Sequence, residues 1–290
     1  MAYAGTSRTS ARRVYGNGPA PLVRMLAAAG MACALMLCIG AALAEDWPGH
    51  ERLTREQVIA AVANSSEHAR ADLSSKNLSG LDLSGVDFKG ANLSATVFNR
   101  SDLRRARLAG CNLTVSFGEG ADFRQANLRG AEMFSMQLAG ADLRGADLTG
   151  ARFIGDMSHA RLEGAVLRNL RGGADMTNQS MGLMNARFTS ARLDDADLTG
   201  ADVSRADLSF AHLSGVKLVG AKLVRVDLSG ADLSGADLTN ADLRNSTFID
   251  TGFTSTRVSG ARFDGSTWRN VRGLEGAAGR GATGVPPDVR

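Results

Sequence analysis

The sequence repeats every five residues from Ala71 to about residue 270. Typical units are Ala-Asp-Leu-Ser-Gly at 231–235 and Ala-Asn-Leu-Arg-Gly at 126–130, and we call the Leu of each unit its centre. Between residues 73 and 153 there are 17 centres, of which all but Gly118 are Leu, Phe, Met or Val, and all 18 centres between 183 and 268 are apolar. A small residue lies two positions before nearly every centre. A repeat of this regularity dictates a repetitive architecture.

A period of five fits neither the α-helix, at 3.6 residues per turn, nor the extended strand, at two. It is typical of a chain that bends at regular intervals. The centre and the small residue of each unit then point inward, and the Asp, Asn, Arg, Ser, Thr and Gly residues between them point to solvent. Successive coils would pair their backbones about 4.8 Å apart. The pattern therefore predicts an all-β solenoid.

These units resemble the pentapeptide-repeat family, whose pattern is A-(D/N)-L-x-x, over residues 71–270. The resemblance implies a right-handed quadrilateral β-helix with four pentapeptides, hence about 20 residues, per coil. Centres four units apart would then stack along one inner face. The centres that we expect in the core include Leu83, Leu103, Phe123, Leu143, Leu208, Leu228, Phe248 and Trp268.

The register divides the repeats into block 1, residues 71–153, and block 2, residues 183–270. After Phe153 the centres slip by one residue, to Leu162, and Leu183 restores the first phase. Residues 154–182 are therefore predicted to be an irregular insertion or loop. Two interpretations stay open: a binding element, with candidate interaction residues Arg161, Arg168 and Arg171, or a neutral insertion or decayed coil.

The first and last coils of a solenoid expose unpaired backbone groups and apolar side chains, so other segments must cover them. Residues 45–70 are predicted to be an N-terminal capping segment, with a short helix from Thr54 to Ala63 that begins at a Thr54–Gln57 capping box. Its expected apolar side consists of Leu53, Val58, Ile59 and Val62. Trp268 and Val271 are expected to close the other end, and residues 271–290 are interpreted as a disordered tail.

Residues 1–44 are typical of an export signal. Arginines precede an apolar run from Met25 to about Leu43, and Ala42-Leu43-Ala44 predicts cleavage before Glu45. The protein is then exported, periplasmic or secreted, with no stable membrane insertion after cleavage. The alternative is an uncleaved membrane anchor, because the apolar run is near the lower limit for spanning a bilayer. Two of the three cysteines lie in this signal, so the mature chain can form no intrachain disulfide.

The net charge of +3 comes from the signal, which has four arginines and no acidic residue. The remaining 29 basic and 30 acidic residues give the mature chain a charge of −1. This balance disfavours a polycationic nucleic-acid surface. It also lacks the strong acidity of a DNA mimic.

We find no catalytic constellation in the sequence. The four histidines have no metal-ligand spacing, and no nucleophile elbow, zinc-protease motif or phosphate-binding loop occurs. We therefore expect no catalytic residues, no cofactor and no metal.

The four-face stacking implied by the resemblance sorts the outward residues into columns. In block 2, Asp and Lys or Arg alternate along two columns, which would attract modestly between layers. They are Asp197, Lys217, Asp237 and Arg257, and Asp202, Lys222, Asp242 and Arg262. One column of block 1 is entirely acidic: Asp82, Asp102, Asp122 and Asp142. This column is either a by-product of the repeat or a site for a cation or a basic partner.

Together these features favour an exported, non-enzymatic pentapeptide-repeat scaffold that binds another protein of unknown identity and is monomeric. The alternative is a cytoplasmic DNA mimic that binds a topoisomerase such as gyrase, as some family members do. The export signal and the near-neutral mature charge argue against that alternative.

Overall fold

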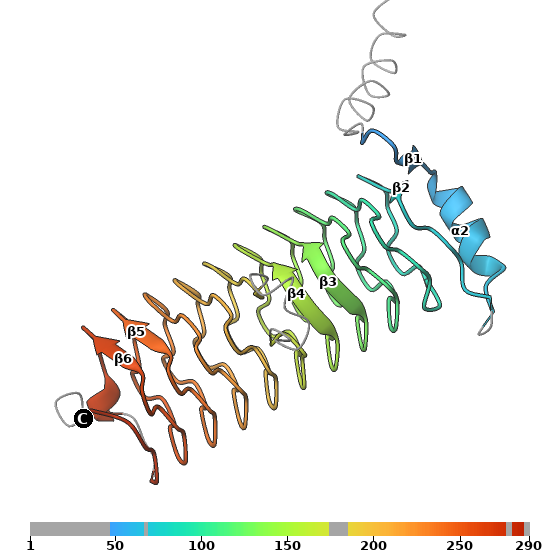
Figure 1. The fold of residues 1–290 in the computed structure, drawn as a ribbon. Helices are drawn as coiled ribbons and strands as arrows, with labels where there is room; N and C mark the ends of the chain where they lie inside the picture. Colours follow the sequence, from blue (N-terminus) through green and yellow to red (C-terminus); the bar gives the residue numbers. More distant parts are fainter. Residues whose placement is uncertain (1–46, 67–68, 174–184, 277–279, 287–290) are drawn as a thin grey trace, which may run out of the picture. The chain divides into compact units, whose positions relative to one another are not determined.

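The structure, a computed structural model, describes residues 47–66, 69–173, 185–276 and 280–286. The predicted signal, residues 1–44, lies outside the described residues. From residue 71 onward the chain winds into stacked coils of a parallel β-helix, one coil behind the next in sequence order (Figure 1). In the first repeats, four parallel bridges join one coil to the next: Asp72↔Asn92, Asn77↔Val97, Asp82↔Asp102 and Asp87↔Arg107. Each bridge joins residues that are four repeat units apart, so a coil contains four pentapeptides.

The unit 81–85 shows why this sequence bends where it does. The Asp82 carboxylate accepts a hydrogen bond from the amide of Ser84 at 3.0 Å, an Asx turn that fixes the bend. Gly85 has φ +67°, a left-handed conformation that glycine adopts without steric cost. The Leu83 amide meanwhile donates to the Asp102 carbonyl of the next coil at 2.7 Å. Asp at the outward position and Gly at the corner thus have structural roles in the repeat.

The interior consists of stacked centres and small residues. Seven of the eight centres expected in the core are at most 1% exposed: Leu83, Leu103, Phe123, Leu143, Leu208, Leu228 and Phe248. The eighth, Trp268, is half-buried and stacks on Phe248 with ring centroids 4.5 Å apart. Where Thr or Ser replaces the small alanine, its hydroxyl bonds a neighbouring carbonyl, as Thr96 does to Leu73 at 2.8 Å. The narrow core is therefore filled without unpaired hydroxyls at these positions.

Two pairs of longer strands interrupt the one-residue bridges. Strand β3 (Glu132–Gln137) pairs in parallel with β4 (Arg152–Asp156), and β5 (Thr247–Ile249) pairs with β6 (Thr267–Arg269) (Figure 1). The β3–β4 register shifts between Phe134 and Gln137, so that Gln137 lies opposite Asp156 rather than Met157. This bulge absorbs the one-residue slip of the repeat.

The prediction of an irregular insertion over residues 154–182 is wrong for its first part. Residues 156–172 form an ordinary coil that is one residue short. Its bridges to block 1 include Asp142↔Arg161 and Asp147↔Val166, and its bridges to block 2 include Arg161↔Arg192 and Val166↔Asp197. Its centres Leu162 and Leu167 are fully buried. The rest of the predicted insertion, from residue 174, lies outside the described residues.

The N-terminal part adds a strand and a helix to the first coils. Strand β1 (Glu51–Arg52) pairs in parallel with β2 (Lys76–Asn77). Helix α2 (Arg55–Ala63) has Thr54 as its N-cap and the Thr54–Gln57 capping box. Val58 and Val62 join the hydrophobic core, while Ile59, which we expected on the same apolar side, is 41% exposed.

Residues 47–50 lie along the outside of the coils, which the repeat pattern did not indicate. The Trp47 ring packs on Phe117 with centroids 4.7 Å apart, and the His50 Nε2 lies 3.0 Å from the carbonyl oxygen of Ala95. Phe117 and Val97 belong to one outward column, and Val97 is fully buried. Val97 and Phe117 are thus apolar at outward positions on the side of the coils where residues 47–50 pack.

The C-terminal end continues the coil beyond the predicted boundary. Arg272 bridges Gly252, and Thr283 bridges Arg262 with one residue more than the regular spacing. A 3-10 turn, η3 (Leu274–Gly276), lies between them, and Leu274 and Val285 are buried. The interpretation of residues 271–290 as a disordered tail is therefore wrong for 271–276 and 280–286. In the parts of the chain that the structure describes, no helix is long and apolar enough to cross a membrane.

Candidate interaction surface

The acidic column of block 1 is stacked as expected, since bridges link Asp82 to Asp102, Asp102 to Asp122, and Asp122 to Asp142. Each carboxylate also accepts the amide hydrogen of the residue two positions later, at 3.0–3.2 Å. These bonds hold the four carboxylates in one row. Stacked like charges repel, so the row needs compensation.

Arginines two residues after the aspartates supply that compensation. Guanidinium nitrogens of Arg104, Arg124 and Arg144 lie 2.5–2.6 Å from the carboxylates of Asp102, Asp122 and Asp142. Two of them also reach the next coil: Arg104 lies 3.7 Å from Asp122, and Arg124 lies 3.8 Å from Asp142. At the start of the row, Arg55 of α2 pairs with Asp82 at 3.2 Å. We call these four aspartates and the three arginines 104, 124 and 144 the Asp–Arg ladder.

The ladder stabilises the charged form of its carboxylates. Hydrogen bonds from the Arg104 guanidinium lower the pKa of Asp102 below its usual value. Burial by itself raises the pKa of Asp142, but hydrogen bonds from Arg144 outweigh it and the pKa is lowered. Asp102 and Asp142 are therefore ionised at neutral pH, and their charge is balanced within the molecule by the arginines.

The ladder continues past Asp142 with its signs exchanged. Arg161, which stacks on Asp142, lies 4.0 Å from that carboxylate and 3.5 Å from Glu163. In the next coil, Arg192 lies 3.2 Å from Glu163 and 3.9 Å from Asp194. The arginines now occupy the column that the aspartates held before. Arg161 thus belongs to the same face as the acidic column, although we predicted it in a separate loop.

Arg168 and Arg171 lie on two other faces of the same coil. Arg168 pairs with Asp197 at 2.7 Å, and Arg171 pairs with Glu132 of β3 at 2.9 Å. Neither lies beside the acidic column, so the structure does not gather the candidate interaction residues into one site. All three arginines instead hold coils together.

A shallow pocket of about 410 Å³ opens over the ladder. Ser84 and Gly85 line it together with polar and basic side chains, Arg104, Arg105, Arg124 and Gln125. Arg105 donates to the Gln125 side-chain oxygen at 3.0 Å. The pocket is therefore lined by guanidinium and amide groups, which makes it a poor receptor for a cation or a basic partner.

The alternating columns of block 2 are stacked in the predicted order. Lys222 lies 3.9 Å from Asp202, and Arg257 lies 3.1 Å from Asp237. Such exposed pairs contribute modestly, roughly 0.2–1 kcal/mol each. Within the described residues no three His, Cys, Asp or Glu side chains are placed to hold a metal ion.

The ladder arginines were absent from the residues that we singled out in the sequence. Their signal is present, because Asp-x-Arg recurs once per coil in three successive coils, at 102–104, 122–124 and 142–144. The Asp-x-Arg signal was missed because only the residue before each centre was assigned to a column, and these arginines follow the centre. The residue after the centre shares the same outer face and must be included in the column.

Comparison with known proteins identifies the repeats. The family model of pentapeptide repeats matches in eight copies over residues 69–169 and 191–265, more than half of the chain. The chain belongs to the pentapeptide repeat family. No match was found among the curated proteins.

Solved pentapeptide repeat structures share the fold. The chain is 25% identical to HetL from the cyanobacterium Nostoc sp. strain PCC 7120, a pentapeptide repeat protein involved in heterocyst differentiation regulation, with a TM-score of 0.56. That match covers 81% of this chain and 92% of HetL. Full-length QnrB1, a plasmid-mediated fluoroquinolone resistance protein, is 20% identical over 71% of this chain and 92% of its own, with a TM-score of 0.42. Like other pentapeptide repeat proteins, this chain is a right-handed β-helix.

For this pentapeptide repeat protein, Arg124→Met should lower stability at neutral pH. The change leaves Asp122 and Asp142 stacked without the cation between them, but the pair is partly exposed, so we expect the Tm at pH 7 to fall by no more than about 4 °C. The lowered pKa values of Asp102 and Asp142 mean that the ladder stabilises the fold above their unfolded pKa, about 3.9, and that this contribution is lost as the pH falls through the folded values.

Thermal unfolding of wild type and Arg124→Met at pH 7 and pH 2.5 measures this effect. The difference in Tm should be present at pH 7, shrink in 1 M salt, and be smaller at pH 2.5 than at pH 7. A difference of the same size at both pH values would mean that Arg124 acts through packing alone.

Proposed function

We propose that this protein is an exported, non-enzymatic scaffold that binds another protein. The observation that carries the proposal is that the charged side chains of the acidic column are occupied in hydrogen bonds and ion pairs that hold the coils together. In the acidic column of block 1, Asp102, Asp122 and Asp142 accept corner amide hydrogens and pair with arginines. Their chemistry maintains a long, rigid β-helix whose varied surface is suited to recognition.

Export is supported by the sequence of residues 1–44, an arginine-led apolar run that ends in Ala42-Leu43-Ala44. We propose cleavage before Glu45, so that Trp47, which packs on Phe117, is the third residue of the mature chain. The mature protein would then lie in the periplasm or outside the cell, monomeric and without a membrane anchor. The uncleaved anchor is the alternative.

We further propose that each coil is quadrilateral and that α2 caps the first coil. The four bridges per coil support the first point, with one bridge per side. Burial of Val58 and Val62 in the core supports the second, as does the contact of the Arg55 side chain with the carbonyl of Asp82. A covered first coil leaves the faces, rather than the N-terminal end, for a partner.

A cytoplasmic DNA mimic that binds gyrase is the alternative function. Mimicry requires a long surface of negative potential that matches the phosphates of a duplex. The ladder cancels that field in block 1, and the alternating columns cancel it on two faces of block 2. We therefore propose that the protein binds no nucleic-acid-processing enzyme in this way.

A supercoiling assay with purified residues 45–290 separates the two functions. We expect no inhibition of gyrase at micromolar protein. Inhibition that disappears when Asp82, Asp102, Asp122 and Asp142 are changed to Asn would reverse the conclusion. A pull-down from the cell envelope with the same mature chain should recover a protein partner that a solenoid of scrambled surface charge does not recover.

A further inference from the structure

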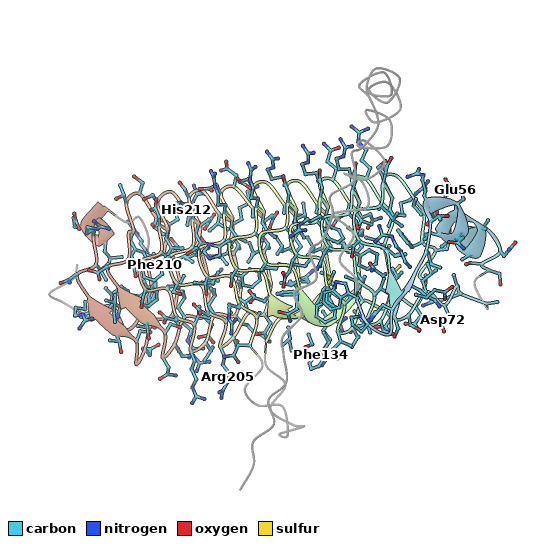
Figure 2. All side chains as sticks on the ribbon, turned by 90° about the horizontal axis from the view of Figure 1, so that it is seen from above. Glu56, Asp72, Phe134, Arg205, Phe210 and His212 are labelled. Atoms are coloured by element: carbon cyan, nitrogen blue, oxygen red, sulfur yellow. The ribbon has the colours of Figure 1, made fainter. Side chains whose placement is uncertain are left out.

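Phe210 is the large hydrophobic side chain with the greatest exposure in the described part of the chain, 62% (Figure 2). It occupies a corner position where about half of the units have Gly, and its φ is +57°. A bulky residue in the left-handed region is uncommon, and such strain costs of order 1 kcal/mol. Its ring adds little to the core, so the packing of the coil does not explain its presence.

The Phe210 ring lies over the corner of the next coil. Its Cδ1 is 2.5 Å from the point where a Cβ on Gly230 would stand. The Phe210 amide donates to the Ser229 carbonyl at 2.8 Å, which fixes the corner below the ring. The bare glycine thus provides the space for the ring to lie along the surface.

Three aspartates surround this corner: Asp227 and Asp232 flank Gly230, and Asp250 follows Gly230 by one coil. All three are exposed, and none is within salt-bridge distance of an Arg or Lys in the described residues. The hydroxyls of Ser229 and Ser234 donate to Asp227 and Asp232 at 2.6 Å and 2.5 Å. These carboxylates are therefore held in place while their charge stays uncompensated, unlike those of the ladder.

Two basic residues of the coil before Phe210 are already engaged. Arg187 and Arg192 lie in the coil before Phe210. Arg187 pairs with Asp156 at 3.0 Å, and Arg192 pairs with Glu163 at 3.2 Å. His212, two residues after Phe210, lies on the adjoining face (Figure 2). The corner thus combines an exposed aromatic ring with unpaired negative charge.

We infer that this corner, formed by Phe210, Gly230, Asp227, Asp232 and Asp250, binds a basic segment of the partner protein. An apolar side chain of that segment would cover the ring, and its Lys or Arg side chains would pair with the aspartates and contact the ring face. Self-association through the same corner is disfavoured, because it would bring the aspartates of two copies together. The inference rests on the proposed scaffold function and names the chemistry of its partner.

The test places the photo-reactive residue p-benzoylphenylalanine at position 210 of the full chain in the producing cells. Matched chains carry it at position 115, where Val115 is also an exposed apolar corner residue (45%) with positive φ, and at position 59 on α2. Cross-linked peptides are sequenced by mass spectrometry. We expect position 210 to cross-link a protein segment that contains at least two Lys or Arg residues beside an apolar residue.

The double change Asp227→Asn and Asp232→Asn should reduce the position-210 cross-link at least fivefold, whereas Asp87→Asn, which removes a carboxylate paired with Arg107, should not. An acidic segment, a second copy of this chain, or a cross-link insensitive to the double change would overturn the inference. Cross-links to a partner at position 115 or 59 but not at 210 would leave the scaffold function standing and remove this surface. Cross-links at none of the three positions would count against both.

Discussion

Replacing Leu228 with alanine is expected to destabilise the protein by about 2–5 kcal/mol. The Leu228 side chain is fully buried between coils, and its backbone amide donates to the Thr247 carbonyl of the next coil. Truncation removes its packing and leaves a cavity that the stacked coils cannot close. For a chain of this size the Tm should fall by roughly 5–15 °C.

Ser229→Ala is the matched control, because Ser229 is the next residue and faces outward. Its hydroxyl donates only to Asp227, so its loss should change the Tm by no more than about 2 °C. Thermal unfolding followed by circular dichroism compares the two variants. Equal effects would contradict the assignment of Leu228 to the interior.

Gly155→Ala, in β4 just before the shortened coil, is expected to be strongly destabilising. Gly155 lies in β4 opposite the bulge of β3, and a Cβ there would overlap the carbonyl oxygen of Met136, a backbone atom that cannot rotate away. Overpacking costs about 1–3 kcal/mol in general, and we expect the upper part of that range. The two strands would have to separate or shift register.

Gly150→Ala serves as the comparison, because Gly150 has φ +66° and no atom within 4 Å of the point where a Cβ would stand. Its cost should be limited to the left-handed conformation, about 1 kcal/mol. The midpoints of denaturant unfolding measure both variants. If Gly150→Ala proved the more harmful, conformational strain rather than the bulge would limit this region.

The fold was predictable from the sequence because one rule generates it. Leu or Phe at the centre, a small residue two positions before, and Asp followed by Gly at the corner specify both the burial and the bend of each unit. The same rule placed Asp197 beneath Lys217 and Asp202 beneath Lys222. It also indicated where the phase slips, after Phe153.

The consequence of that slip was not predictable from the pattern. A one-residue deletion can produce either a loop or a shortened coil. Here a shortened coil forms, because the bulge in β3 lets Gln137 pair with Asp156 and the backbone ladder continues. The C-terminal end differs for a related reason. Leu274 and Val285 pack against the last coil without repeating the five-residue spacing, so residues 271–286 resembled a tail.

The candidate surface was the least predictable part. The acidic column was correctly stacked, yet its charge depends on Arg104, Arg124 and Arg144, which belong to a second column on the same face. Phe210 was not singled out in the sequence, because the corner position varies from unit to unit. Only its exposure, together with the unpaired Asp227 and Asp232 beside it, distinguishes the corner from the others.

The most direct test of the proposed exported scaffold is to fractionate the producing cells, purify the protein from each fraction, and identify its first residue by mass spectrometry. We predict a mature chain that begins at Glu45, recovered from the periplasmic or extracellular fraction. Recovery of a soluble cytosolic chain that still contains residues 25–44 would contradict export and would restore the cytoplasmic alternative.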